Sequence, residues 1–268
     1  MKNIAILIIL ALYSFSAKAQ QTPLDDITKR DIIQEKLPLA YTPINERDIF
    51  WENRIWRVID VREKMNLPFA NPNRPFFSIL TEAAQKGKIT LYNTETDDFS
   101  YPMSEEDLNK KLFTSDTVEI WTEAETMELR VVSDEINPED IKRYRVKEVW
   151  YFDSKSSVMK VRILGIAPLK EVFDDFGNFK YEQPMFWVHY PSARNVLAKE
   201  LAFTDGNQAA RTSWEDLLER RQFASTIYKQ SDVLNRRLED MYSGVDRLLE
   251  ADKIKQEMFN VEQDFWSY

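Results

Sequence analysis

The chain of 268 residues contains no cysteine, one histidine and five glycines, and each scarcity removes a class of site. Without cysteine, and with His189 alone, the usual zinc and copper sites lack their ligands. A Ser/His/Asp triad would have to use His189, yet no G-x-S-x-G motif surrounds any serine. The phosphate-binding motifs G-x-G-x-x-G and G-K-[ST] do not occur. We therefore expect no catalytic residue, no metal ligand and no cofactor.

Acidic residues outnumber basic ones by 45 to 36, which gives a formal net charge of −9. Such a chain gains nothing from long-range attraction to a phosphate backbone, so nucleic acid is not an expected partner. Basic pairs such as Arg220-Arg221 lie among acidic neighbours, a pattern typical of a solvated helix face.

Residues 1–19 have the three parts of a secretory signal peptide. Lys2 gives a positive start, an apolar run follows over residues 4–12, and Ala17 and Ala19 fit an A-x-A cleavage site. The apolar run has roughly half of the ~20 residues that cross a bilayer, which makes an uncleaved anchor the less favoured alternative. No cysteine is available to carry a lipid. We therefore expect an exported chain with no direct membrane anchor, held in the periplasm by what it binds.

The first strong pattern predicts a helix from Asn45 to Asn66. Asn45 is a good N-cap, and the Asp48 carboxylate three residues later suits the free N–H groups of a first turn. The apolar residues that recur at helical spacing are Trp51, Ile55, Val58 and Ile59.

The remaining pattern indicates an α+β fold, in which an antiparallel β-meander packs with several helices and a C-terminal helix follows. The expected helices cover residues 76–86, a segment capped by Ser104, residues 192–200, a segment capped by Ser213, and residues 231–241. The expected strands cover residues 89–92, residues 126–132 and the meander from 143 to 190. We divide the mature chain into an N-terminal arm (20–44), a mixed α+β body (45–243) and a C-terminal helix (244–268), with Gly244 as a candidate hinge.

The C-terminal helix carries an apolar seam that begins at Ala251 and repeats at spacings of three and four residues. It is only two heptads long, too short to predict a coiled coil. We expect the seam to dock on a partner or on a neighbouring subunit, and packing on the chain's own body is an equally supported alternative. The predicted partner-binding residues are Ile254, Met258, Val261, Phe265 and Trp266.

Two local patterns have ordinary structural interpretations. His189 lies in an apolar run, which favours a histidine packed at a strand end with one hydrogen bond. The segment Asp174 to Asn178 resembles part of a calcium loop but lacks the distal glutamate, so a solvated turn is favoured.

Aromatic residues make up 13% of the chain, more than one small core needs. Most should be core residues, and at least one should anchor an interface.

Four segments resemble a known family. They are Asp48 to Asn66 (DIFWENRIWRVIDVREKMN), Glu148 to Asp153 (EVWYFD), Ser157 to Pro168 (SVMKVRILGIAP) and Trp187 to Ser192 (WVHYPS). These are long and unusual motifs, and they resemble the gliding motility family GldN, called PorN in non-gliding relatives. The resemblance covers about residues 28 to 237. The helix after Gly244 carries no motif of this family.

The resemblance implies a non-enzymatic periplasmic component of the type IX secretion system of the Bacteroidetes. It implies binding to a GldK- or PorK-like lipoprotein, self-association in a ring beneath the outer membrane and a link to a GldM- or PorM-like motor protein. A carbohydrate- or peptidoglycan-binding module is the alternative, because tryptophan and tyrosine occur beside carboxylates. A glycosidase built on two carboxylates is a third hypothesis, with adjacent acids such as Glu105-Glu106 as its only sequence support.

Overall fold

A computed structural model describes residues 33–121, 127–174, 176–204, 206–207, 209 and 211–266. The predicted signal peptide (1–19) and the first part of the arm lie outside these residues. Within the described ranges the body is built on one antiparallel sheet of seven strands, in the order β11-β1-β5-β6-β8-β2, with β7 paired to β6. Its strands are β1 (Ile49–Asp60), β2 (Leu91–Tyr92), β5 (Ile141–Asp153), β6 (Val158–Phe173), β7 (Phe179–Pro184), β8 (Trp187–His189) and β11 (Thr226–Gln230). The predicted α+β class is confirmed.

The predicted helix over residues 45–66 is wrong. Only a 3-10 turn, η2 (Glu46–Asp48), follows Asn45, and strand β1 then runs to Asp60. The apolar residues of this segment fit a helical stripe, but the segment buries side chains on both faces of the sheet. Ile55 and Trp56, which are adjacent and point to opposite faces of the strand, are both buried. Aromatic and β-branched residues suit such a strand, and pairing with β5 along its length overrides the local helix signal.

The predicted meander is confirmed between residues 141 and 190. Strands β5 and β6 pair in antiparallel register from Ile141 to Asp153, joined by a short turn. Strand β6 has 16 residues; its second half pairs with β7, and β8 pairs with it near Gly165. β6 therefore links the centre of the sheet to a hairpin at its rim.

Helices cover one face of the sheet and enclose the main core. They are α2 (Phe76–Gln85), α3 (Glu105–Leu112), α4 (Tyr190–Leu197) and α5 (Trp214–Glu219), together with the 3-10 helix η3 (Lys64–Ala70). At the centre of this core, Phe76 and Trp214 have ring centroids 4.4 Å apart, and Phe69 and Tyr144 pack against them. The predicted helix over residues 76–86 is confirmed and ends one residue earlier, and the helix predicted over 192–200 is present but lies at Tyr190–Leu197.

The predicted helix caps are confirmed, whereas the predicted secondary structure after residue 225 is largely wrong. Ser104 and Ser213 cap α3 and α5, the latter as a full capping box with Asp216. The predicted helix over 231–241 is reduced to α6 (Leu238–Met241), and the edge strand β11 precedes it. That strand was missed because it has only five residues and its buried positions are filled by Ile227 and Lys229.

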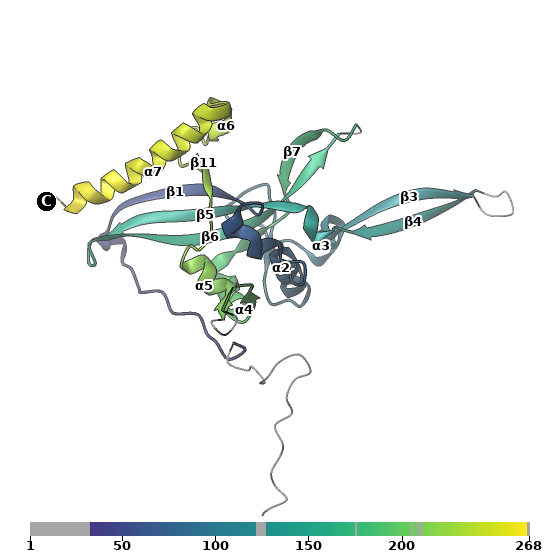
Figure 1. The fold of residues 1–268 in the computed structure, drawn as a ribbon, viewed down its shortest axis with the longest axis horizontal. Coiled ribbons are helices and arrows are strands. Elements are labelled where there is room, and N and C mark those ends of the chain that lie inside the picture. Colours follow the sequence, from purple (N-terminus) through teal and green to yellow (C-terminus); the bar gives the residue numbers. More distant parts are fainter. Residues whose placement is uncertain are drawn as a thin grey trace, which may run out of the picture.

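The long helix α7 (Gly244–Trp266) ends the described chain and confirms the predicted C-terminal helix. Figure 1 shows it lying along the β11 and β1 side of the sheet. Gly244, the candidate hinge, is the first residue of this helix and has a φ of +57°.

Two hairpins extend away from the body (Figure 1). One consists of β3 (Phe113–Trp121) and β4 (Met127–Glu135), which pair only with each other among the described strands. The other is formed by β7 and the end of β6. Smaller elements complete the fold: η4 (Pro138–Asp140), β9 (Leu201–Ala202) and β10 (Thr212–Ser213).

Candidate interaction surfaces

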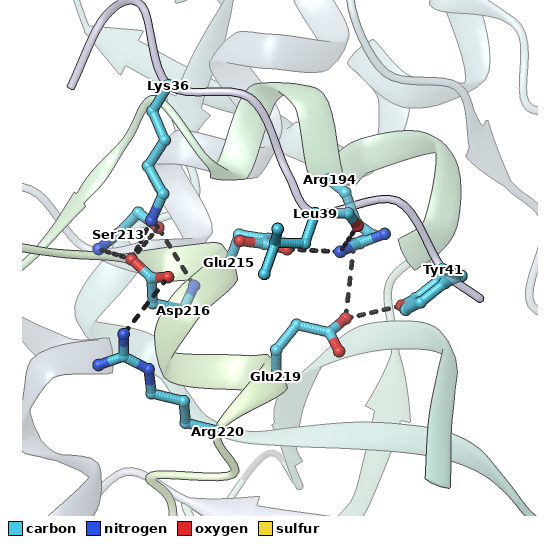
Figure 2. Close-up of polar contacts among 9 residues, drawn as sticks. All are labelled: Lys36, Leu39, Tyr41, Arg194, Ser213, Glu215, Asp216, Glu219 and Arg220. Carbon is cyan, nitrogen blue, oxygen red and sulfur yellow. Dashed lines mark hydrogen bonds and ion pairs between the residues drawn. The ribbon is translucent and has the colours of Figure 1, made fainter. Parts of the chain in front are cut away.

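The described part of the N-terminal arm crosses helices α4 and α5 and is held there at two points, the first of which is Arg194 (Figure 2). Arg194 Nη2 donates to Glu215 Oε1 at 2.6 Å and to the carbonyl oxygen of Leu39 at 2.8 Å. Both charged side chains are buried, so each needs the other as a counter-charge. The same guanidinium therefore completes an internal ion pair and binds the arm backbone.

Tyr41 closes this contact from the outer side. The Arg194 guanidinium carbon lies 3.9 Å from the Tyr41 ring centroid, a close cation–π stack. The Tyr41 hydroxyl donates to Glu219 Oε1 at 2.6 Å. Burial, and then the bond to Glu219, raise the pKa of Tyr41, so the hydroxyl keeps its proton at any physiological pH. The arm is thus held by aromatic, ionic and backbone contacts at one point.

A second anchor lies nearer the start of the described chain. Lys36 forms an ion pair with Asp216 and donates to Ser213 Oγ at 3.0 Å. These are the capping residues of α5, so the arm is attached to the helix N-terminus (Figure 2). Between the anchors, Leu37 and Leu39 point outward and are highly exposed. We call residues 36–41 with Arg194, Glu215, Asp216 and Glu219 the arm clasp.

The sequence did not predict the arm clasp. Arg194 and Glu215 were placed on the correct helices, but they are 21 residues apart and no spacing rule joins them. The sequence does place Arg194 on the same helix face as the apolar Tyr190 and Leu197, and this position could have indicated a buried arginine that needs a counter-charge.

The β6–β7 hairpin presents a cluster of exposed aromatic residues. Phe176 at its tip is 90% exposed, and the other members are Phe173, Phe179 and Tyr181. The predicted solvated turn is confirmed: Asp174 Oδ1 accepts from the backbone N–H groups of Phe176 at 3.0 Å and Asn178 at 2.7 Å. The bond to Asn178 is the main reason why the pKa of Asp174 is lowered. Asp175, predicted to share this turn, lies outside the described residues. The fixed turn holds a large apolar side chain in solvent, which is typical of a protein contact.

The seam of α7 packs mainly on the body of the chain itself. Ile254 and Met258 are buried against Ile55 and Ile227, and Val261 and Phe265 are half-buried. The Phe265 ring lies 4.6 Å from that of Phe152. Trp266 is 61% exposed, and its Nε1 donates to the Ser157 carbonyl at 2.9 Å. The partner-binding role predicted for these five residues stays a prediction, and Trp266 is the member most accessible to a partner.

His189, the one histidine of the chain, has a structural partner. His189 ends β8 and its Nδ1 lies 3.2 Å from Ser192 Oγ, so the predicted strand-end histidine with one hydrogen bond is confirmed. Within the described ranges, no three His, Asp or Glu side chains are grouped so that they could hold a metal ion. Among these same residues, no helix is both long and apolar enough to span a bilayer.

Comparison with known families identifies the chain. The family described as gliding motility associated protein GldN matches residues 44–267, which includes the whole sheet, both hairpins and α7. A comparison with curated proteins finds no match. The match covers most of the sequence and agrees with the four motifs at 48–66, 148–153, 157–168 and 187–192. The chain therefore belongs to the GldN family of gliding motility associated proteins.

Proposed function

We propose that this chain is a non-enzymatic structural subunit of the type IX secretion and gliding machinery. In this proposal it lies in the periplasm, assembles with further copies into a ring and is held under the outer membrane by a GldK- or PorK-like lipoprotein. A GldM- or PorM-like motor protein contacts the same assembly. Family membership over residues 44–267 is the observation that carries the proposal.

The surfaces described above support a role in assembly. A ring subunit needs at least two different contact surfaces, because each copy meets its neighbours through heterologous contacts. The exposed aromatic hairpin and the exposed Leu37 and Leu39 of the arm are separate surfaces on different segments of the chain. Aromatic anchors of this kind dominate the energetics of protein interfaces.

Deletion of the gene in the native bacterium tests the proposal. We expect loss of secretion of proteins that carry a C-terminal targeting domain, and loss of gliding where the strain glides. Re-expression of the wild-type chain should restore both. Normal secretion in the deletion strain would contradict the proposal. Affinity purification from the envelope should recover the lipoprotein partner.

The carbohydrate-binding alternative receives less support. Such modules stack sugars on several exposed tryptophans, yet Trp56, Trp187 and Trp214 are buried. Trp266 is exposed, but its Nε1 is bound to the Ser157 carbonyl. The exposed aromatic cluster of the hairpin consists mainly of phenylalanine. A pull-down on purified cell wall separates the two functions, because retention by the isolated protein is expected only for a wall-binding module.

A further inference from the structure

The 3-10 helix η3 divides its side chains between the core and the surface. Phe69 lies in the main core, and the side-chain amide of Asn66 makes two hydrogen bonds of 2.9 Å with the backbone of Ala224. Met65 and Leu67, on either side of Asn66, are 59% and 53% exposed. These two apolar side chains are therefore presented to solvent by a backbone that is fixed from within.

The outward side of η3 borders a hollow of about 640 Å³ whose lining is mainly apolar. Phe203, which follows β9 and is itself exposed, and Leu217 of α5 also line it. Sites that enclose a ligand or an inserted side chain have volumes of about 300–1,000 Å³, and exposed apolar surface of this kind is typical of a contact site. We call this hollow the η3 groove; its lining includes Lys64, Met65, Leu67, Pro68, Phe203 and Leu217.

The tip of the β6–β7 hairpin, residues 173–179, is a fixed apolar projection. The bonds that the Asp174 carboxylate accepts hold the turn, and the rings of Phe173 and Phe179 meet edge to face with centroids 6.4 Å apart. Phe176 extends from this support into solvent. Because the tip is ordered before it binds, inserting Phe176 into a pocket costs little conformational entropy.

The tip and the groove carry charges of opposite sign. The sequence of the tip, residues 173–179, contains two aspartates and no basic residue. The hydrogen bond from the Asn178 backbone is the main reason why the pKa of Asp174 is lowered, so this carboxylate is ionised at neutral pH. Lys64 is exposed and is the one charged residue among the described residues that line the η3 groove. Opposite charges beside an apolar contact favour one orientation of the two partners.

The tip and the η3 groove of one chain lie apart. In Figure 1 the β7 hairpin projects above the long strands of the sheet, whereas α5, which contributes Leu217 to the groove, lies below them. Strand β6 runs unbroken from the sheet into the hairpin and holds the tip away from the groove of its own chain. A projection and a hollow on different sides of one chain can join one copy to the next. Such a contact is heterologous, and its repetition builds a ring or a filament.

We propose that the hairpin tip of one copy docks in the η3 groove of a second copy. Phe176 packs there against Met65 and Leu67. The acidic tip lies beside Lys64. This proposal rests on the assembly function proposed above and assigns one contact between neighbouring subunits to named residues.

Sedimentation velocity of the purified chain and its variants tests the proposal. The wild-type chain should form oligomers larger than dimers as its concentration rises. Phe176→Ser removes the projecting side chain and Leu67→Ser alters the groove, and each should weaken self-association at least tenfold. A 1:1 mixture of the two variants should associate again but stop at dimers, because the intact tip of Leu67→Ser can enter only the intact groove of Phe176→Ser.

Both substitutions replace exposed side chains, so the Tm of each variant should remain close to that of the wild type. If Leu67→Ser does not fold, Met65→Ser takes its place. Phe259→Ser, which replaces an exposed phenylalanine on α7, should associate like the wild type. The proposal is overturned if the wild-type chain stays monomeric up to about 1 mM, where even a weak contact forms. It is also overturned if Phe176→Ser or Leu67→Ser associates like the wild type, or if their mixture stays monomeric.

Photo-crosslinking in the native envelope identifies what the tip contacts. Phe176→p-benzoylphenylalanine should crosslink to residues 64–73 or 203–217 of a second copy, and crosslinks to a different protein alone would overturn the proposal. These results are separate from the deletion phenotype. If deletion abolishes secretion but the mixture stays monomeric, only the docking is wrong; if the mixture forms dimers but the deletion strain secretes normally, only the proposed role in secretion is wrong.

Discussion

Arg194 and Glu215 form a buried ion pair at 2.6 Å, and the same guanidinium binds the N-terminal arm through the Leu39 carbonyl. The attachment of the arm therefore depends on an interaction inside the body. At this contact the arm contributes a carbonyl and an aromatic ring, whereas the charges come from α4 and α5. Loss of the arm should leave the ion pair in place, but loss of Arg194 should release the arm near Tyr41, while the Lys36 anchor at Asp216 remains.

The first prediction concerns this pair. Arg194→Met should lower the free energy of unfolding by about 3–5 kcal/mol, because it leaves the Glu215 carboxylate buried without a counter-charge. It should also make the arm near Tyr41 sensitive to proteases. Chemical denaturation and timed proteolysis measure the two effects.

Arg220→Met is the matched control for Arg194→Met. Arg220 is exposed and its nitrogen lies 4.0 Å from Asp216, so its loss should change stability by only about 0–1 kcal/mol. Equal effects of the two variants would show that the buried pair does not hold the arm.

A second prediction concerns the packing of α7. Met258→Ala should destabilise the chain by about 2–5 kcal/mol, because it opens a cavity between α7 and the strands β1 and β11. Leu249→Ala, on the exposed side of the same helix, should have an effect within about 0.5 kcal/mol. Urea unfolding measures both. A negligible effect of Met258→Ala would mean that the seam is free for a partner.

A third prediction concerns acid stability. The hydrogen bond from Lys160 holds the pKa of Asp153 at about 2, below its ordinary value of 3.8. A depressed carboxyl pKa favours the folded state above the unfolded pKa, and this contribution is lost as pH falls from about 4 to 2. Asp153→Asn should therefore flatten the fall in stability over that range.

Unfolding as a function of pH measures this effect. Asp252→Asn, on an exposed face of α7, should leave the pH profile of the wild type unchanged. If the free energy of unfolding of Asp153→Asn falls in parallel with that of the wild type from pH 5 to 2, the Lys160 contact does not cause the loss of stability in acid.

A fourth prediction concerns the aromatic hairpin. Phe176→Ser should leave the free energy of unfolding within about 0.5 kcal/mol of the wild type, because the side chain is almost fully exposed. It should reduce recovery of the partner lipoprotein or of higher-order assemblies from native envelopes. Phe259→Ser, an exposed phenylalanine on α7, is the control. Equal recovery with both variants would exclude the hairpin tip from the interface.

The sequence predicted those elements whose local signals agree with their tertiary environment. The meander from 143 to 190 alternates clearly, and the serine caps at Ser104 and Ser213 lie where helices begin. The segment after Asn45 was mispredicted because its apolar residues satisfy the helical and the extended period alike. Pairing with β5, which follows between 83 (Asp60 with Arg143) and 104 residues later (Ile49 with Asp153), decides between them, and a local pattern contains no information on that pairing.

The candidate surfaces were harder to predict than the fold. Phe176 and Met258 are both apolar, yet the first is exposed and the second is buried. The difference depends on which neighbours the tertiary structure supplies, and the local sequence does not contain it. The arm clasp joins Tyr41 to Arg194 across more than 150 residues. The contact of Lys147 and Lys229 with the Trp56 ring also depends on register, because these residues become neighbours only when β5, β1 and β11 are aligned.

Strand β6 has a mechanical consequence. One unbroken strand of 16 residues pairs with β5 in the middle of the sheet and with β7 at the projecting hairpin. A pull on the hairpin tip along the strand direction is therefore transmitted through the covalent backbone into the sheet. Because the inter-strand hydrogen bonds lie perpendicular to the strands, such a pull loads many of them together in shear. A hairpin built in this way can carry tension without a flexible joint between its tip and the core.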